Sequence, residues 1–544
     1  MADFGHEDRF ARVSIVFSFI ALGLGGLFGL VQLITRTPYM PKLVNEAGYY
    51  TVLTGHGVLM AIVWTAFFIM GFAAYLVPRE LGVRLSPKLL WAALLLSVAG
   101  TAAAATVILA GKATVLYTFY APLAAHAAFY LGAAVLIIGT WIFAAAIFKA
   151  YLEWRRANKD KEAPIATLGV LATLIIWLEA TPPLAFMVLK DLVPMALAGK
   201  YVDPLETRTY FWYFGHPLVY FWLVPAVAFW YYAIPRILGV RLFSRSMAKV
   251  AYILFIVAST PVGLHHQFMD PGISGFAKFF HTVTTYMVAT PSLLTAFNLI
   301  ATMERAGRAA GGRGFLGWVW RLPWGNPVFA GSALSLILFG FGGIGGIINA
   351  SYTLNYIVHN TMWIVGHFHL TVGTAVTLTF MAASYALVPS LFGRELASIR
   401  LARVQPYLWF VGMLIFSLAL HLAGLYGVPR RVYDVMYGGA APASWVAPLL
   451  VAAMGGIVFW SSGALFLLEM MATMLRARPG SQGVQLLPAV PESLGRKTVL
   501  DSLKLWILIA VVLIAIGWSI PFYEIYSRGL SPVPPVGPDG IKLG

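Results

Sequence analysis

The chain contains no cysteine and has few charged residues. None of the 544 residues is a cysteine, which excludes disulfides, thiolate metal sites and covalently attached c-type haem. Charged residues make up only 11% of the chain, whereas 60% of its residues are apolar. This composition does not fit a water-soluble domain and is typical of a polytopic membrane protein. Any metal bound by this chain must therefore be held mainly by histidine.

The excess of basic residues indicates membrane topology. The formal net charge is +16, but Lys and Arg lie between the apolar runs and form no basic domain, so we expect no nucleic-acid partner. Most of the 37 Lys and Arg residues fall at the N-terminus or in the connections after even-numbered apolar runs. By the positive-inside rule, this distribution predicts a cytoplasmic N-terminus and a C-terminus outside the cell.

Apolar runs of about 20 residues predict an all-α fold, a polytopic membrane bundle of about 13 transmembrane helices. We expect a single membrane domain over residues 1–544, with polar tails at residues 1–12 and 529–544. The first tail carries acidic residues and does not resemble a cleavable signal peptide. The predicted helices start near Val13, Thr51, Leu89, Pro122, Ile165, Tyr210, Ala248, Phe279, Val328, Met362, Gln405, Val446 and Leu503.

Two histidines, His367 and His369, stand two residues apart in an apolar stretch. In an α-helix this spacing turns the side chains about 200° apart, so one helix can hold two separate metal centres. A buried histidine in a membrane helix is also often only a hydrogen-bonded contact. Ligation is favoured here because the predicted topology places four more histidines at the same outer depth of the membrane: His56, His216, His265 and His266.

Six histidines at one depth suit a combination of haem and copper. Haem iron accepts one or two axial imidazoles, and a single imidazole leaves one face open for a diatomic ligand. Copper favours imidazole nitrogen, and three such ligands leave a position for a substrate. The six residues therefore divide naturally into two, one and three, although their spacing does not say which histidine serves which centre.

Three motifs resemble the catalytic subunit of the haem-copper oxygen reductases. They are Trp212-Tyr-Phe-Gly-His216-Pro-Leu-Val-Tyr220, His265-His266-Gln267-Phe268 and His367-Phe368-His369. The resemblance implies a low-spin haem, expected to be of the b type, and a high-spin haem of the a or a related type with one copper ion beside it. The ligands that it implies are His56 and His369 for the low-spin haem, His367 for the high-spin haem, and His216, His265 and His266 for copper.

The resemblance also assigns catalytic roles to His216 and Tyr220, which lie four residues apart on one helix face. In the family this pair is covalently cross-linked, and the tyrosine supplies an electron and a proton when the oxygen bond breaks. Many members have a glutamate where this chain has Leu218. In lacking this glutamate, the chain resembles the B family. Members of that family take up protons along a single route analogous to the lysine channel of their relatives.

Polar residues on two predicted helices resemble that proton route. Ser292, Thr295 and Asn298 are spaced by three and share one helix face, although such residues are also common as packing contacts in membranes. The complete path that the resemblance implies consists of Tyr220, Tyr231, Ser244, Ser292, Thr295 and Asn298. Val227 and Asn298 stand where the family pattern has a tyrosine and a threonine, so either water bridges at least one step or the path bends.

Four residues near the predicted outer surface are candidates for haem propionate contacts. Arg430 and Arg431 can hold carboxylates by charge-assisted hydrogen bonds, and His359 and Asn360 precede the helix that carries His367. An ordinary interfacial arginine pair is the alternative reading, and the family resemblance favours propionate contact.

These features predict a terminal respiratory oxidase subunit in a prokaryotic cell membrane, which reduces oxygen to water with proton uptake from the cytoplasm and proton pumping. The resemblance implies as partners a subunit II with a copper centre that receives electrons, cytochrome c as donor, a small accessory membrane subunit and the lipid bilayer. A quinol donor stays open. A nitric oxide reductase is the nearest alternative, disfavoured by Tyr220, and a secondary transporter is the alternative from another class.

Overall fold

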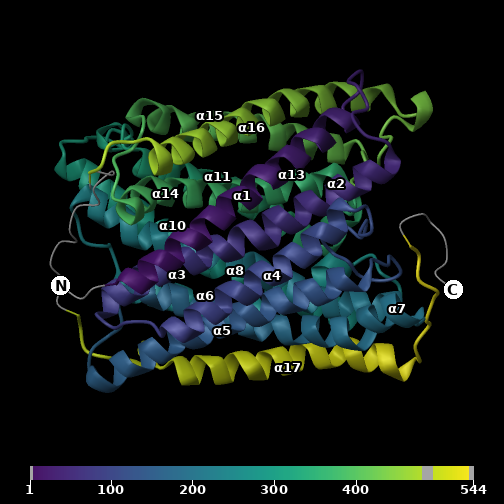
Figure 1. Cartoon of the computed structure of the whole chain (residues 1–544), viewed down its shortest axis with the longest axis horizontal. Helices are drawn as coiled ribbons and strands as arrows, with labels where there is room; N and C mark the ends of the chain where they lie inside the picture. Colours follow the sequence, from purple (N-terminus) through teal and green to yellow (C-terminus); the bar gives the residue numbers. More distant parts are fainter. Residues whose placement is uncertain (1–3, 481–493, 538–544) are drawn as a thin grey trace.

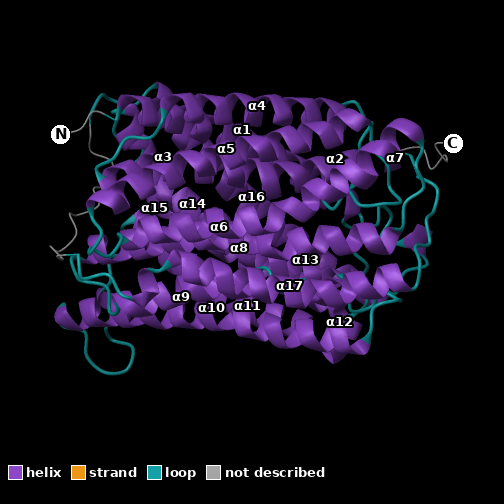
Figure 2. Ribbon diagram, turned by 90° about the horizontal axis from the view of Figure 1, so that it is seen from below, coloured by secondary structure: helices purple, strands orange, loops and turns teal. Residues whose placement is uncertain are grey.

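The bundle is helical throughout the part of the chain that the structure, a computed structural model, describes: residues 4–480 and 494–537. The ends of both predicted polar tails lie outside these residues. Twelve spans in the described part are long and apolar enough to cross a membrane. The helices run side by side along the long axis, and the connecting loops gather at its two ends (Figures 1 and 2). The predicted all-α membrane bundle is thereby confirmed.

The helices follow the predicted order along the chain. Their bounds are α1 (Gly5–Arg36), α2 (Glu46–Val58), α3 (Thr65–Leu81), α4 (Pro87–Leu109), α5 (Ala127–Ala157), α6 (Ile165–Met187), α7 (Val193–Ala198), α8 (Pro204–Leu238), α9 (Arg245–Ser259), α10 (Gly275–Ala309), α11 (Pro327–Ala350), α12 (Tyr352–Val358), α13 (Met362–Leu370), α14 (Thr377–Phe392), α15 (Ile399–Leu425), α16 (Val446–Leu475) and α17 (Leu503–Ser527). One predicted membrane helix, the run that starts near Ala248, is not among the twelve spans. It corresponds to α9, which has 15 residues. Helix α1 begins at one end of the bundle and α17 ends at the other, as an odd number of crossings requires (Figure 1).

The first helix starts at Gly5, well before the predicted start near Val13, so most of the predicted N-terminal tail is helical. The reason is Glu7, whose side chain is fully buried. Its carboxylate accepts a hydrogen bond of 2.8 Å from the backbone N–H of Leu85 and lies 3.7 Å from the guanidinium of Arg84. Glu7, in the predicted polar tail, is therefore packed inside the bundle as part of α1.

Two π-helical turns interrupt the helices that carry histidines. Leu59–Trp64 joins α2 to α3, and Thr371–Val376 joins α13 to α14. One turn begins three residues after His56 and the other two residues after His369. Single π-helical turns inside longer helices occur frequently at functional sites, and here they mark two helices that turn imidazoles towards each other.

Glycines let α11 approach α13 closely. A Cβ atom at Gly342 would lie 2.6 Å from the Cγ2 atom of Thr371, and one at Gly345 would lie 2.9 Å from the Nδ1 atom of His367. Small residues permit such close contact between membrane helices. This glycine-rich stretch therefore serves helix packing and brings its backbone to His367.

A buried ion-pair network fixes α17 at the end of the bundle that is predicted to face the cytoplasm. The Nζ atom of Lys249 on α9 lies 2.6 Å from Glu162 and 3.0 Å from Asp501, which directly precedes α17. Burial alone would raise the pKa values of both carboxyls. Hydrogen bonds from Lys249 and from backbone N–H groups more than offset that effect, and both pKa values lie below their ordinary range.

Replacing Lys249 with Met is expected to destabilise the protein, because two acidic side chains at this network lose their buried cation. Removing one partner of a buried ion pair typically costs about 3 to 5 kcal/mol. The free energy of unfolding of the purified protein in detergent measures the effect. Lys149→Met is the matched control, because Lys149 is 59% exposed and its pair with Glu153 is a surface pair.

The pH dependence supplies a second check on the same network. Groups with a lowered pKa stabilise the folded state above their ordinary pKa, and this contribution disappears as the pH falls through the lowered value. The stability difference between the wild type and Lys249→Met should therefore shrink in acid, below the ordinary carboxyl values of 4.5 and 3.8. Equal stability of the Lys249 and Lys149 variants at neutral pH would contradict the account.

Candidate functional site

The imidazoles of His56 and His369 face each other from α2 and α13. Their ring centroids lie 6.4 Å apart and their planes differ by 11°. The Nδ1 atom of each ring lies 2.8 Å from a backbone carbonyl oxygen, that of Gly25 for His56 and that of Val365 for His369. A carbonyl oxygen only accepts hydrogen bonds, so each Nδ1 carries the proton. Both Nε2 atoms keep a lone pair for a metal.

The separation of these two rings fits one metal ion between them. The ring centroids of His56 and His369 are 6.4 Å apart, which is too far for direct stacking. By comparison, the stacked rings of His266 and Trp212 have centroids 3.8 Å apart. Bonds from a metal ion to two imidazole nitrogens take up about 2 Å on each side. The pair is therefore spaced as two axial ligands of one haem iron would be.

His367 leaves the opposite side of α13 and contacts α11. Its Nδ1 atom lies 2.9 Å from the carbonyl oxygen of Gly342, which again leaves the Nε2 lone pair free. The ring is near enough to His216, His265 and His266 to interact with each of them electrostatically. His367 and His369 thus leave α13 towards different helices, as their two-residue spacing predicts.

His216, His265 and His266 form a cluster that could hold a metal ion. The possible ligand atoms of the three side chains all lie within 4.8 Å of one another. The Nε2 atom of His266 is 3.4 Å from the Nδ1 atom of His216. Two nitrogens bound to one tetrahedral metal ion at about 2 Å each would be about 3.3 Å apart. The cluster therefore fits a copper ion without rearrangement of this pair.

His265 and His266 lie outside the transmembrane helices. Helix α9 ends at Ser259, and both histidines lie in the short 3-10 helix Leu264–Gln267 that follows. Gly263 before it has a φ of +156°, and a Cβ atom there would lie 2.5 Å from the backbone oxygen of Trp212. A side chain cannot fit at this position, so the glycine permits the sharp turn that presents both imidazoles.

Thr285 orients one ring of this cluster and was not predicted from the sequence. Its Oγ1 atom lies 3.0 Å from the Nδ1 atom of His265 and donates its own proton to the carbonyl oxygen of His281 at 2.5 Å. The hydroxyl oxygen therefore accepts the Nδ1–H of His265 and leaves Nε2 for the metal. His281 itself bonds to the backbone oxygen of Gly517 at 3.0 Å, which gives this histidine a structural role.

The pair His216 and Tyr220 lies on one face of α8, as the four-residue spacing predicts. Their ring centroids are 5.0 Å apart with an interplanar angle of 67°. The Nε2 atom of His216 is buried and has no hydrogen-bond partner among the described residues. Since the Nδ1 atom of His216 faces the cluster of three histidines, its Nε2 atom is the nitrogen available to Tyr220.

Positively charged side chains gather at the outer end of the site. Two nitrogens of Arg430 donate to the Oδ1 atom of Asn360 at 3.0 and 3.2 Å, and Arg431 lies 5.5 Å from the ring centre of Tyr117. The Nη2 atom of Arg431 is buried without a partner among the described residues. Burial and the adjacent Arg431 lower the pKa of Arg430 to about 10. Such unpaired positive charge fits carboxylate ligands.

Arg208 belongs to the same cluster and was missed in the sequence. It forms an ion pair of 2.8 Å with Asp270 and lies 5.3 Å from the ring centre of Tyr120. Burial, Arg430 and Arg208 together lower the pKa of His359 to about 4, so this imidazole is neutral at physiological pH. A sequence signal for Arg208 is its place on α8, about two helical turns before His216.

The structure brings together part of the predicted proton path. The hydroxyl of Tyr231 donates to the Oγ1 atom of Thr295 at 3.2 Å. Ser292 is half-buried and lies about one turn before Thr295 on α10. Asn298 and Ser244 also meet, but the amide of Asn298 bonds to both backbone groups of Ser244, at 2.8 and 2.9 Å. The Ser244 hydroxyl accepts the N–H of Met247 and caps α9.

Comparisons with known proteins agree with this geometry. The family described as Cytochrome C and Quinol oxidase polypeptide I matches residues 9–459. Cytochrome c oxidase subunit 1 of Thermus thermophilus is 41% identical, with 97% of this chain and 96% of that protein covered. The heme-copper oxidase subunit I+III of Aeropyrum pernix is 27% identical over 87% of this chain and 57% of its own length.

A solved structure supports the same grouping. The cryo-EM structure of a heme-copper terminal oxidase dimer superimposes with a TM-score of 0.91 at 36% identity, covering 98% of this chain and 95% of that one. Fold, site geometry and sequence therefore agree, and the chain belongs to the haem-copper oxidase subunit I family.

Proposed function

We propose that this protein is the catalytic subunit of a terminal cytochrome c oxidase, which reduces oxygen to water and takes up protons from the cytoplasm. The observation that carries the proposal is the arrangement of six buried or half-buried imidazoles as a facing pair, a single ring and a cluster of three. Four of the six rings have Nδ1 bound to an oxygen atom, which leaves Nε2 for a metal.

The ligand assignment follows this arrangement. His56 and His369 hold a low-spin haem of the b type, His367 holds a high-spin haem of the a or a related type, and His216, His265 and His266 hold one copper ion. When bound, these groups supply the electrons and the binding place for oxygen. The protein fixes four of these six rings through backbone carbonyls and Thr285.

Tyr220 serves as the residue that donates a proton and an electron at the oxygen site. Its support is the orphan Nε2 atom of His216, which is the place for the expected covalent bond between the two rings. Thr295 and Tyr231 supply protons towards it from the inner side, with Ser292 on the same helix face. Leu218 in place of a glutamate favours the B family and a single proton route.

The outer cluster holds the haem propionates. Arg430, Arg431, His359 and Asn360 take this role, and Arg208 joins them because its guanidinium lies in the same concentration of positive charge. Charge-assisted hydrogen bonds to carboxylates would satisfy the orphan nitrogen of Arg431. The propionates would thereby fix the height of both haems in the bundle.

The setting is a prokaryotic plasma membrane with a cytoplasmic N-terminus. Electrons reach this subunit from cytochrome c through a copper centre in a subunit II, and a small accessory membrane subunit completes the complex. The relative in Thermus thermophilus is named as a cytochrome c oxidase subunit, which supports cytochrome c over a quinol donor. Proton pumping across the membrane accompanies oxygen reduction.

Cofactor analysis of the purified complex tests the function. We expect two haems and one copper bound to this subunit, with oxygen turnover exceeding nitric oxide turnover. A nitric oxide reductase would instead show non-haem iron in place of copper and faster turnover of nitric oxide. A protein without haem absorbance would overturn the oxidase proposal and return the secondary transporter to consideration.

Thr285→Val is expected to weaken copper binding, because it removes the oxygen that fixes the orientation of His265. Loss of such an outer hydrogen bond typically costs about 10- to 100-fold in metal affinity. Copper content after dialysis against a chelator measures the effect, with haem spectra showing that the fold is intact. Thr284→Val is the control, because the Thr284 hydroxyl bonds only to backbone carbonyls in the described structure. Equal copper retention by both variants would contradict the role of Thr285.

A further inference from the structure

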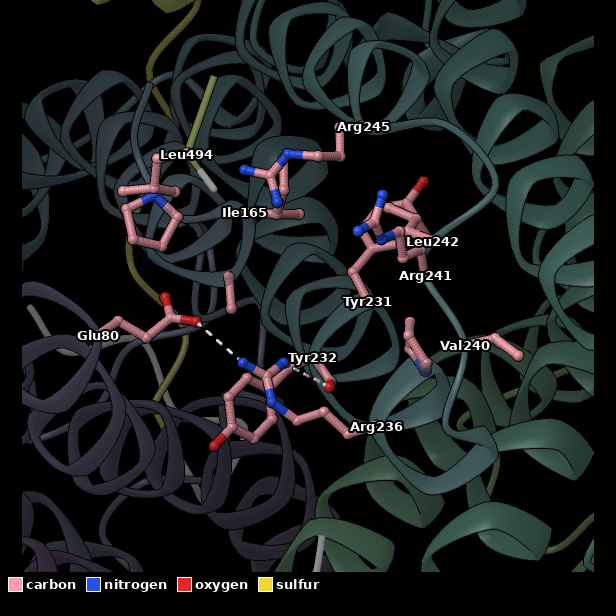
Figure 3. Close-up of a pocket in the computed structure, with 13 residues that line it drawn as sticks. Glu80, Ile165, Tyr231, Tyr232, Arg236, Val240, Arg241, Leu242, Arg245 and Leu494 are labelled. Carbon is pink, nitrogen blue, oxygen red and sulfur yellow. Dashed lines mark hydrogen bonds and ion pairs between the residues drawn. The ribbon is translucent and has the colours of Figure 1, made fainter. Parts of the chain in front are cut away.

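A cavity of about 290 Å³ opens at the inner ends of α3, α6 and α8. Since one water molecule occupies about 30 Å³ in the liquid, the cavity has room for several. Its lining includes the exposed Arg241, so it reaches the surface of the described structure. Glu80 and Arg236 meet at one side of it, and Tyr231 and Arg241 lie at the other (Figure 3).

Glu80 is the single acidic residue among the described residues that line this cavity. Its Oε2 atom accepts hydrogen bonds from the backbone N–H and the hydroxyl of Thr167, at 2.9 and 2.7 Å. Its Oε1 atom lies 4.0 Å from the guanidinium of Arg236. The carboxyl group on α3 is therefore held in a fixed position at the edge of the cavity.

Tyr231 connects the cavity to the proposed proton path. This residue lines the cavity, and its hydroxyl donates to Thr295 on α10. A proton that reaches Tyr231 from the cavity can therefore pass directly to a residue of the path. No passage along the inner end of α10 is needed for this step.

Tyr252 on α9 carries a hydroxyl that the packing leaves without a partner. The side chain is 3% exposed, and its oxygen is buried with no hydrogen bond among the described residues. Its ring lies edge-on to that of Tyr231 at 5.9 Å, and it interacts electrostatically with both Tyr231 and Glu80. A buried hydroxyl normally finds a partner, so this orphan hydroxyl beside Tyr231 points to a buried water that it serves.

The inner part of the path predicted by resemblance is occupied by structural hydrogen bonds. Asn298 uses both ends of its amide on the backbone of Ser244. Thr302, one turn further inward, accepts the N–H of Phe243 and donates to the carbonyl oxygen of Asn298. These bonds close the seam between α10 and the connection before α9.

We propose that the cavity is the cytoplasmic entrance for protons, with Glu80 as the residue that collects them and Tyr252 as a relay to Tyr231. The inference rests on the proposed oxidase function. Water gives a proton to the Glu80 carboxylate, which passes it through cavity water, and through a buried water at the Tyr252 hydroxyl, to Tyr231. Each hydroxyl oxygen accepts one proton as its own proton leaves, that of Tyr252 towards Tyr231 and that of Tyr231 towards Thr295, and no electron moves.

Two variants test this entrance in the purified full complex. Glu80→Gln keeps the oxygen that accepts from Thr167 but cannot collect a proton, and Tyr252→Phe removes only an orphan hydroxyl, so that folding should be unaffected. Both should slow proton uptake, followed with a pH-sensitive dye after oxygen mixing, and Glu80→Gln by at least about tenfold. Haem spectra and thermal stability should match those of the wild type.

Three further variants separate the possible outcomes. Glu304→Gln is the control, because Glu304 is an acid at the inner end of α10 that pairs with Arg308. Thr295→Val should slow uptake, and Ser244→Ala should slow it less than Glu80→Gln does. Wild-type uptake in both Glu80→Gln and Tyr252→Phe, with slow uptake in Thr295→Val, would overturn the entrance and leave the oxidase function standing. Absence of haem and of oxygen turnover in the wild type would overturn the function itself.

Discussion

The hydrogen bond from a histidine Nδ1 to a backbone carbonyl is the constraint on which the site depends. It recurs at His56, His367 and His369, with distances between 2.8 and 2.9 Å. In each case the bond fixes the tautomer and aims the Nε2 lone pair away from the supporting helix. Because the acceptors belong to the backbone, ring orientation is set by helix packing and does not require further polar side chains in the membrane interior.

Helix packing must therefore be accurate where these carbonyls lie. Gly342 offers its carbonyl to His367, and Gly345 leaves no room for a side chain against the same ring. On the other side of α13, the π-helical turn Thr371–Val376 follows His369 directly. The two faces of one short helix are thus held by different devices, a close glycine contact and a local change of helical pitch. Together they keep the two proposed haem centres on a single rigid element.

The helices and the six histidines could be predicted from the sequence because hydrophobic runs and motif spacing are local signals. The facing of His56 and His369 agrees with the predicted pairing, and the cluster of three agrees with the predicted copper set. Thr285 and Arg208 could not be predicted with the same ease, because their partners are distant in sequence or set by a turn. The π-helical turn Leu59–Trp64 has no glycine or proline to signal it, whereas Thr371–Val376 contains Gly373.

Buried carboxylates are paired with cations at both ends of the bundle, as at Lys249 with Glu162 and at Arg208 with Asp270. The two ends differ in the groups that the pairing leaves over. Glu80 borders a cavity at one end, and at the other the Nη2 atom of Arg431 has no partner among the described residues. The proposed proton uptake and the proposed carboxylate binding each rest on one of these groups.

The most direct measurement of the central claim, that α13 holds two different centres, compares His56→Ala and His126→Ala by reduced-minus-oxidised and carbon monoxide difference spectra. His126 caps α5 and serves as the control. The account predicts that His56→Ala loses the low-spin haem signal, while carbon monoxide still binds at the haem held by His367. Loss of carbon monoxide binding with the low-spin signal intact would contradict it.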